Sequence, residues 1–237
     1  MSLETIIIQL AIGLLKSIAI FALTLLGSLP LGLLVAFGRM SKWAPLKRLT
    51  LTGNGRFKQS LAGIRPLQIL VKLYISLMRG TPLMLQLMVV YFGPYYLFKI
   101  PIGQNYRFTA VVIGFVLNYA AYFAEIYRSG IESMPVGQYE AAAVLGYSRP
   151  QTFFKIILPQ VIKRILPSIT NEVITLVKDT SLAFAISYSE MFTMARKISS
   201  SQSTLVPFVV AGIFYYLFNL IMAYVMERAE KSLSYFR

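Results

Sequence analysis

The feature of this sequence that most constrains its fold is a series of apolar windows, each close to the length that crosses a lipid bilayer. A helical span needs about 20 mostly apolar residues. Hydrophobic residues make up 57% of the 237 residues, and charged residues make up only 14%. Soluble domains carry roughly 25% charged residues, so the sequence predicts an all-α integral membrane protein.

Five windows are predicted to be transmembrane helices. They cover approximately residues 12–37, 83–98, 108–126, 162–187 and 206–226, and the second is entered through residues 74–78. Glycine and proline interrupt the first window, which membrane helices tolerate because neighbouring helices satisfy the freed backbone groups. The N-terminus carries Glu4 where a secretory signal would carry basic residues. We therefore expect the first window to be a retained span rather than a signal peptide.

The positive charge of the chain predicts its orientation. Lysine and arginine total 23 against 9 acidic residues, which gives a net charge of +14. In a soluble protein this excess would suggest nucleic acid, but here it falls between apolar windows, so we expect no nucleic-acid partner. Segments 39–79 and 128–164, with the tail after residue 227, carry 17 of the 23, and the other two connections carry four. The positive-inside rule then places the N-terminus outside and the C-terminus in the cytoplasm.

The composition excludes several kinds of catalytic site. The chain contains no cysteine and no histidine, which removes disulfides, thiolate nucleophiles, the commonest zinc ligands and a histidine base. It also lacks a G-x-x-x-x-G-K-[ST] phosphate-binding loop. Glu125, Glu172 and Asp179 are the candidate buried acids, and they form no evident pair or metal constellation. We therefore expect no catalytic, cofactor-binding or metal site in this chain.

The connection between the first two windows, residues 39–79, is long and basic. Residues 39–72 contain the turn signal Gly53-Asn54-Gly55 and two prolines, which favours a partly ordered surface segment or an amphipathic hairpin. At its end, Arg79-Gly80-Thr81-Pro82 predicts a helix start, with Thr81 as cap and Pro82 at the first helical position. Capping alone and a role in gating are equally compatible with Arg79.

Residues 140–159, EAAAVLGYSRPQTFFKIILP, predict a short cytoplasmic helix–turn–helix. The alanines after Glu140 give the first helix a face of small residues, suited to close docking in a groove. Gly146 permits a sharp turn that other residues disfavour. Ser148 is a plausible N-cap for the second helix, whose first turn tolerates Pro150. An interfacial hairpin without a partner is the alternative that composition alone leaves open.

The spacing of this segment resembles the EAA motif of ABC importer permeases: Glu140-Ala141-Ala142, then Gly146, then Ile156-x-Leu158-Pro159. Segments 79–93, 118–142 and 171–182 look like the polar amino-acid uptake branch of that family, although segment 41–70 is longer than expected. The resemblance implies one transmembrane permease domain over residues 1–237, with 140–159 as the coupling loop. The coupling residues that it implies are Glu140, Ala141, Ala142, Gly146, Arg149 and Pro150.

The same resemblance implies the partners and the location. Such a permease lies in the cell (plasma or inner) membrane and forms the translocation path with a second permease, identical or homologous. A cytoplasmic ABC ATPase dimer engages the coupling loops and holds ATP and magnesium, and an extracytoplasmic binding protein delivers an amino acid. Import rather than export rests on the resemblance alone. The amino acid itself, and whether the permease pair is homodimeric or heterodimeric, are left open.

The fourth window carries charged residues that a bilayer disfavours. Such groups usually face a bundle interior or an aqueous cavity and mark a pathway. Spacings of three and seven place Glu172, Thr175 and Asp179 on one helical face, and Asn171 and Lys178 share a neighbouring face. For a substrate pathway we predict Asn118, Asn171, Glu172 and Thr175, with Tyr119 beside them. For gating or intramembrane pairing we predict Lys178, Asp179 and Arg79.

Two other classes of membrane protein are compatible with ionisable residues in apolar windows. A passive channel or an ion-coupled carrier would also place ionisable residues in spans, but neither needs a cytoplasmic docking segment such as 140–159. A membrane-embedded enzyme would need a catalytic constellation that the sequence does not supply. The sequence thus favours an ATP-driven permease.

Overall fold

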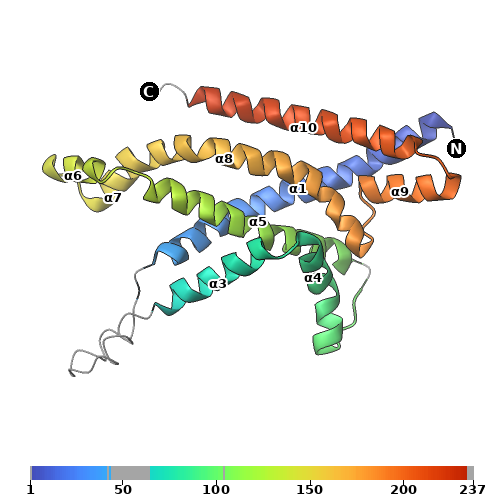
Figure 1. The fold of residues 1–237 in the computed structure, drawn as a ribbon, viewed down its shortest axis with the longest axis horizontal. Coiled ribbons are helices and arrows are strands. Elements are labelled where there is room, and N and C mark those ends of the chain that lie inside the picture. The colour runs from blue at the N-terminus through green and yellow to red at the C-terminus, as the bar shows by residue number, and fades with distance from the viewer. Residues whose placement is uncertain (1, 42, 44–64, 104, 234–237) are drawn as a thin grey trace.

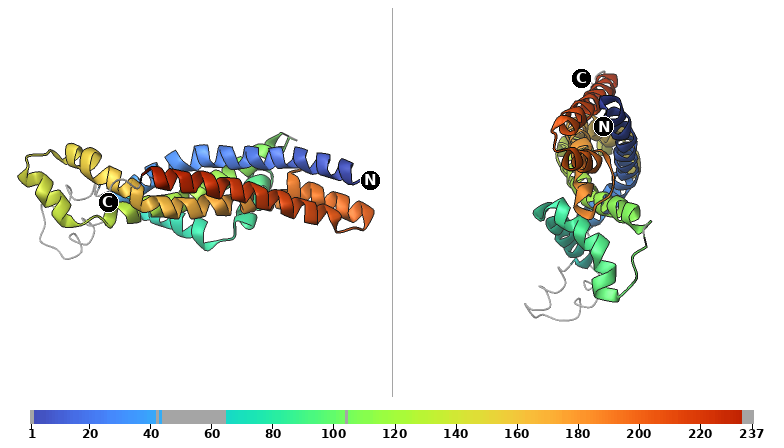
Figure 2. Two further views of the ribbon diagram at one scale, coloured as in Figure 1. Left: turned by 90° about the horizontal axis from the view of Figure 1, so that it is seen from above. Right: turned by 90° about the vertical axis from the view of Figure 1, so that its right-hand side faces the viewer.

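The computed structural model describes residues 2–41, 43, 65–103 and 105–233. In these ranges the chain is helical, and the long helices lie side by side in an elongated bundle (Figures 1 and 2). The elements are α1 (Leu3–Met40), α3 (Pro66–Gly80), α4 (Leu83–Phe98), α5 (Tyr106–Glu132), α6 (Val136–Val144), α7 (Arg149–Thr152), the π-helical turn η2 (Phe153–Ile157), α8 (Leu158–Asp179), the 3₁₀ helix η3 (Thr180–Ile186), α9 (Met191–Gln202) and α10 (Val206–Ser232).

Within the described ranges, three helices, α1, α5 and α10, are long and apolar enough to cross a membrane. Helices α3 and α4 qualify together as a fourth span, although they are bent by 111° at the break between them. Helix α8 has 22 residues but is not among the candidates, and it carries the charges of the predicted fourth window. An all-α membrane protein is therefore confirmed, whereas the number of five spans stays a prediction.

Helix α1 packs closely on α5 and α9 because small residues lie at its contacts. A Cβ added to Gly32 would come within 2.8 Å of the Cβ of Phe123 and 3.0 Å of the carbonyl oxygen of Ala120. A Cβ added to Gly13 would come within 2.7 Å of the Cα of Met191. Small residues that let backbones approach are typical of helix contacts in membranes.

The core lies where α1, α4, α5, α8 and η3 meet. Phe115 and Tyr119 of α5 pack there with Leu176 and Val177 of α8, and all four are buried. The outer surface is apolar as well, because only 11% of the apolar window of α10 is buried. Apolar side chains on both sides of a helix are expected where lipid is the solvent.

The corner between α3 and α4 differs from the prediction. Pro82 is the N-cap of α4 instead of its first helical residue, and Thr81 is the C-cap of α3. The Thr81 hydroxyl donates to the carbonyl oxygen of Leu77 at 2.8 Å, so it closes the end of α3 and does not cap α4. The predicted helix therefore begins one residue later than expected, at Leu83, and Thr81 caps the preceding helix instead of this one.

Part of the long basic connection belongs to the bundle. Residues 66–80 form α3, whose Ile75 is buried against Ala36 of α1 and Ala121 and Ala124 of α5. The predicted surface segment ends with residues 66–72, which form the first turns of α3, and none of them is buried. Residues 44–64, with the turn signal at 53–55, lie outside the described residues, so the predicted hairpin is not tested.

Candidate functional site

The terminal hairpin, formed by α6 and α7 over residues 136–152, has the turn and cap that the sequence predicts. Gly146 adopts a φ of +77°, in the left-handed region that glycine enters without steric cost. Ser148 is the N-cap of α7: its side chain accepts from the backbone N–H of Gln151, and the Gln151 side chain accepts from the Ser148 N–H at 2.9 Å. Pro150 lies in the first turn.

The terminal hairpin projects from one end of the bundle, and α9 lies at the opposite end (Figure 1). Of the predicted coupling residues, Ala142 is buried, and the others are exposed: Glu140, Ala141, Gly146, Arg149 and Pro150. Val144 and Leu145 are 87% and 73% exposed. An apolar tip outside the candidate spans is a surface suited to a protein partner.

The base of the terminal hairpin is fixed to two long helices. Met134 packs with Ile157 of η2 and with Val161 and Ile165 of α8. A Cβ added to Gly130 of α5 would come within 2.2 Å of the Ile165 side chain of α8, so these two helices are in close contact there. A displacement of the hairpin would therefore be passed to α5 and α8 together.

A polar cavity of about 380 Å³ lies between α5, α8 and the α3–α4 corner. It is lined by Thr81, Pro82, Leu83, Asn118, Tyr119, Tyr122, Glu172, Thr175, Asp179 and Leu182. The predicted face of Glu172, Thr175 and Asp179 thus points into one cavity. Asn118 and Tyr119, expected beside that face, line the same cavity from α5.

Most polar groups of this cavity are held by other groups of the chain. The Tyr119 hydroxyl donates to Asp179 Oδ2 at 2.7 Å. The Thr175 hydroxyl donates to the carbonyl oxygen of Asn171 at 2.9 Å, which leaves its oxygen free to accept. Glu172 is different: it is half-buried, and it makes no hydrogen bond or ion pair within the described parts of the chain.

Arg79 supplies the positive charge that acts on Glu172. It is exposed at the C-terminal end of α3, interacts electrostatically with Glu172, and its guanidinium lies 5.2 Å from the ring centre of Tyr122. Asn171 and Lys178 are exposed on the neighbouring face of α8 and do not line the cavity. The remaining acid candidate, Glu125, is accounted for by ion pairs with Arg39 and Arg128.

Asn118 and Gln86 hold the α3–α4 corner. The Asn118 side-chain nitrogen donates to the Met78 carbonyl oxygen and to Gln86 Oε1, both at 3.0 Å. The Gln86 nitrogen lies within 3.0 Å of the carbonyl oxygens of Met78 and Thr81. These are carbonyls that the end of a helix leaves unpaired, and in lipid they need partners. Sequence reasoning missed Gln86, whose only signal is that it is an amide in an apolar window.

Glu190 is a second residue that sequence reasoning missed. It is fully buried at the N-terminus of α9, where it accepts from the backbone N–H groups of Phe192 and Thr193 at 2.6 and 2.7 Å. The hydroxyls of Thr193 and Tyr215 also donate to it, at 2.7 and 3.2 Å. A carboxylate is stabilised at a helix N-terminus, so this one fixes where α9 begins.

The sequence model of the binding-protein-dependent transport system inner membrane components matches residues 61–235, which include α3 to α10. The chain belongs to this family. It is 37% identical over 174 residues to the arginine transport system permease protein ArtQ of Bacillus subtilis (strain 168), covering 73% of this chain and 78% of that protein. It is 32% identical over 223 residues to the L-cystine transport system permease protein TcyB of the same organism, covering 93% and 85%.

Solved structures agree with this family. A crystal structure of an amino acid ABC transporter with histidines matches with a TM-score of 0.78 and 28% identity, covering 94% of each chain. An inward-facing methionine ABC transporter, MetNI, matches with a TM-score of 0.67 over 99% of this chain, and at 15% identity it supports the fold alone. The chain is therefore a membrane permease subunit of the amino-acid ABC transporter type.

Proposed function

We propose that this permease forms half of an amino-acid import path, together with a second permease that is identical or homologous to it. In this proposal the N-terminus is outside and the C-terminus is cytoplasmic. A separate cytoplasmic ABC ATPase dimer binds ATP and magnesium and hydrolyses the nucleotide, and an extracytoplasmic binding protein delivers the amino acid. The relatives named as amino-acid transport permeases support amino-acid transport. The exposed apolar tip of the terminal hairpin supports a contact with the ATPase.

The observation that carries the substrate assignment is the state of Glu172. An ionisable side chain inside a membrane bundle is costly unless it has a partner or water, and Glu172 has neither a hydrogen bond nor an ion pair among the described residues. It faces a cavity together with the accepting oxygen of Thr175. Glu172 would bind the ammonium group or a cationic side chain of the substrate, and Thr175 would accept a further hydrogen bond.

The other predicted residues take supporting roles. Arg79, which acts on Glu172 across the edge of the cavity, would pair with the substrate carboxylate. Asp179 and Asn118 shape the walls, because their polar groups are bound by Tyr119 and by the corner. Asn171 and Lys178, on the exposed neighbouring face, would meet the second permease or the substrate as it passes.

Coupling would run through the terminal hairpin. The ATPase groove would receive the face that carries Glu140, Ala141 and the tip, while Gly146, Arg149 and Pro150 set the turn. Closure of the ATPase dimer on ATP would then move α5 and α8, which the hairpin contacts at its base, and would change the access of the cavity from one side to the other. Such coupling requires a permease with two conformations, whose populations are shifted by nucleotide at the ATPase end and by the binding protein at the other end.

The test is transport and ATP hydrolysis by the reconstituted complex, comparing wild type with Glu172→Gln. A hydrogen bond to a charged group contributes about 1.5–3 kcal/mol, so we expect substrate-stimulated hydrolysis and transport to fall at least about tenfold. Hydrolysis in the absence of substrate should persist. Glu4→Gln, which changes an exposed acid in the first turn of α1, is the matched control.

Two outcomes would contradict the proposal. Normal transport by Glu172→Gln would remove Glu172 from the pathway, and the search would move to Asn118 and α4. Uptake by vesicles that contain the permease without any ATPase would favour a channel or an ion-coupled carrier.

A further inference from the structure

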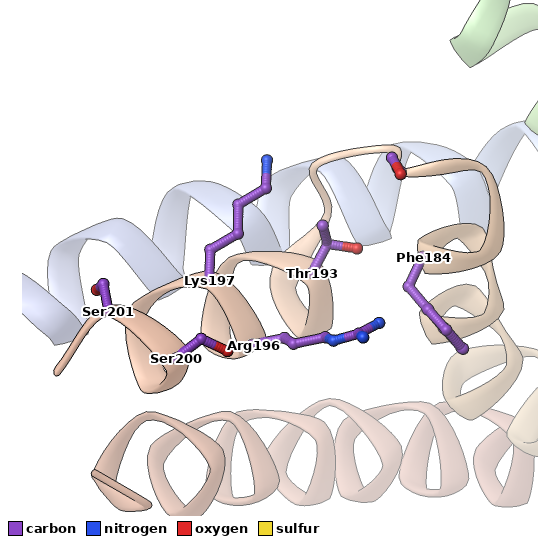
Figure 3. Close-up of a pocket in the computed structure, with 7 residues that line it drawn as sticks. Phe184, Thr193, Arg196, Lys197, Ser200 and Ser201 are labelled. Carbon is purple, nitrogen blue, oxygen red and sulfur yellow. The ribbon is translucent and has the colours of Figure 1, made fainter. Parts of the chain in front are cut away.

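Basic side chains gather at the end of the molecule that lies opposite the terminal hairpin. Lys16 and Arg107 line a cavity of about 610 Å³. Arg196 and Lys197 line a second cavity of about 590 Å³, and Ser187 lines both. Figure 3 shows the second cavity, with Arg196 extending from α9 toward Phe184, whose ring centre lies 5.7 Å from the guanidinium. We call these four basic residues the cationic surface.

No acid of this chain neutralises the cationic surface within the described residues. The ion pairs of the described residues involve the basic side chains of Arg39, Arg128 and Lys231, and none of these lines either cavity. Lys197 donates to the Ser189 hydroxyl at 3.1 Å, and Arg107 donates to the Ser187 carbonyl oxygen at 3.4 Å. The Arg107 Nε is buried and has no hydrogen-bond partner. Neutral groups thus hold Arg107 and Lys197, and none of the four positive charges is paired with a carboxylate of the described residues.

The position of these charges runs against the orientation signal of the chain. Arg107, Arg196 and Lys197 lie in the connections that the positive-inside rule assigns to the outside, where basic residues are disfavoured. Lys99, the other cation of those connections, lies over the ring of Tyr95 and lines neither cavity. A basic side chain that extends to a membrane interface can account for a single residue. It does not account for four that line adjoining cavities from α1, α5 and α9.

We propose that the cationic surface receives an acidic face of the extracytoplasmic binding protein. This inference rests on the proposed function, including its orientation. The basic residues line concavities with polar walls that include Asn105, Ser189 and Ser200, and such concavities fit projecting carboxylate side chains of a folded partner. A surface of one sign speeds association with a partner of the opposite sign and makes it sensitive to salt.

The experiment uses the complete complex in nanodiscs of phosphatidylcholine, with the binding protein that supports transport by wild type. The measurement is the binding-protein concentration that half-maximally stimulates ATP hydrolysis, at low and high salt. Exposed ion pairs are weak, so each of Lys16→Gln, Arg107→Gln, Arg196→Gln and Lys197→Gln should raise this concentration about two- to fivefold. The quadruple variant should raise it at least about tenfold and lose most of the salt dependence.

Two variants make the result specific to the surface. Lys99→Gln removes a basic residue between α4 and α5, the connection that leads to Arg107, and Lys99 lines neither cavity, so this variant should leave the half-maximal concentration unchanged. Lys197→Arg preserves the charge and should behave like wild type. If the quadruple variant does not assemble with the ATPase, the four single variants decide the question.

The outcomes separate this inference from the proposed function. If wild type is stimulated and the variants respond at the same concentration as wild type, the cationic surface is not the docking site, and the proposed function stands. If no binding protein stimulates wild type, both fail. If the variants differ from wild type only when phosphatidylglycerol is added to the nanodiscs, the surface binds anionic lipid and the inference is overturned.

Discussion

The polar cavity and the terminal hairpin differ from the usual distribution of side chains in a membrane protein in opposite ways. The cavity places charged groups among apolar helices, and most of its polar side chains form hydrogen bonds with other groups of the chain; of its two carboxylates, Asp179 is bonded to Tyr119, whereas Glu172 makes no hydrogen bond among the described residues. The hairpin lies outside the candidate spans and yet exposes Val144 and Leu145 at its tip. In each region we assign an external partner to a group that the described residues leave unpaired or exposed: a substrate to the Glu172 carboxylate, and a protein to the apolar tip.

This comparison predicts that the two regions fail in different ways. A change in the hairpin should separate the permease from its ATPase while the bundle stays folded. A change among the bonded groups of the cavity should lower the stability of the bundle, because it leaves a polar group unpaired in an apolar surrounding.

The largest effect is expected from Gly146→Pro. Proline fixes φ near −65° and lacks the N–H, whereas Gly146 has a φ of +77° and donates to the Ala143 carbonyl oxygen at 3.0 Å. We expect loss of co-purification with the ATPase and an unchanged thermal unfolding midpoint of the bundle. Gly137→Ala is the control, because a Cβ at either glycine meets nothing within 4 Å and Gly137 has no positive φ. Normal assembly of Gly146→Pro would show that the turn is not needed for docking.

The next largest effect is expected from Tyr119→Phe in the cavity. It removes the hydroxyl that donates to Asp179, and an unpaired buried acceptor costs about 1–3 kcal/mol, more when it is charged. We expect a lower thermal unfolding midpoint in detergent together with retained ATPase binding. Tyr122→Phe is the matched control, since Tyr122 lines the same cavity and its hydroxyl makes no hydrogen bond among the described residues. Equal destabilisation by the two variants would contradict the assignment of Asp179 to a structural pair.

A smaller effect is expected from Gln86→Leu at the corner. The Thr81 carbonyl oxygen loses its donor, but Asn118 still donates to the Met78 carbonyl oxygen, so we expect a loss of about 1 kcal/mol. Gln9→Leu in α1, whose side chain makes no hydrogen bond within the described ranges, should change nothing. A double-mutant cycle with Asn118→Leu measures the coupling, which should be clearly non-zero because the two amides touch. Additive effects would mean that the corner does not depend on this contact.

The sequence predicts the helical faces of this molecule better than its corners. The face of Glu172, Thr175 and Asp179 follows from the period of one helix, which the sequence alone specifies. The α3–α4 corner does not, because Thr81 and Pro82 are compatible with either helix end. The contact that holds the corner joins Gln86 to Asn118, 32 residues further along the chain. Glu190 was missed for the same reason, since one of its donors is Tyr215, 25 residues away.

The smallest effect is expected from Ser148→Ala at the start of α7. This variant tests whether a mild weakening of the hairpin lowers the affinity for the ATPase in proportion or not at all. Loss of an N-cap costs about 1 kcal/mol, which is much less than the misfit of proline at Gly146. We expect the affinity for the ATPase to fall about fivefold at most, with transport retained at saturating ATPase. Ser148→Thr keeps the capping oxygen and should bind as wild type does. An unchanged affinity for Ser148→Ala would show that α7 is not part of the docking surface, and the contact would then be assigned to α6 and the exposed tip alone.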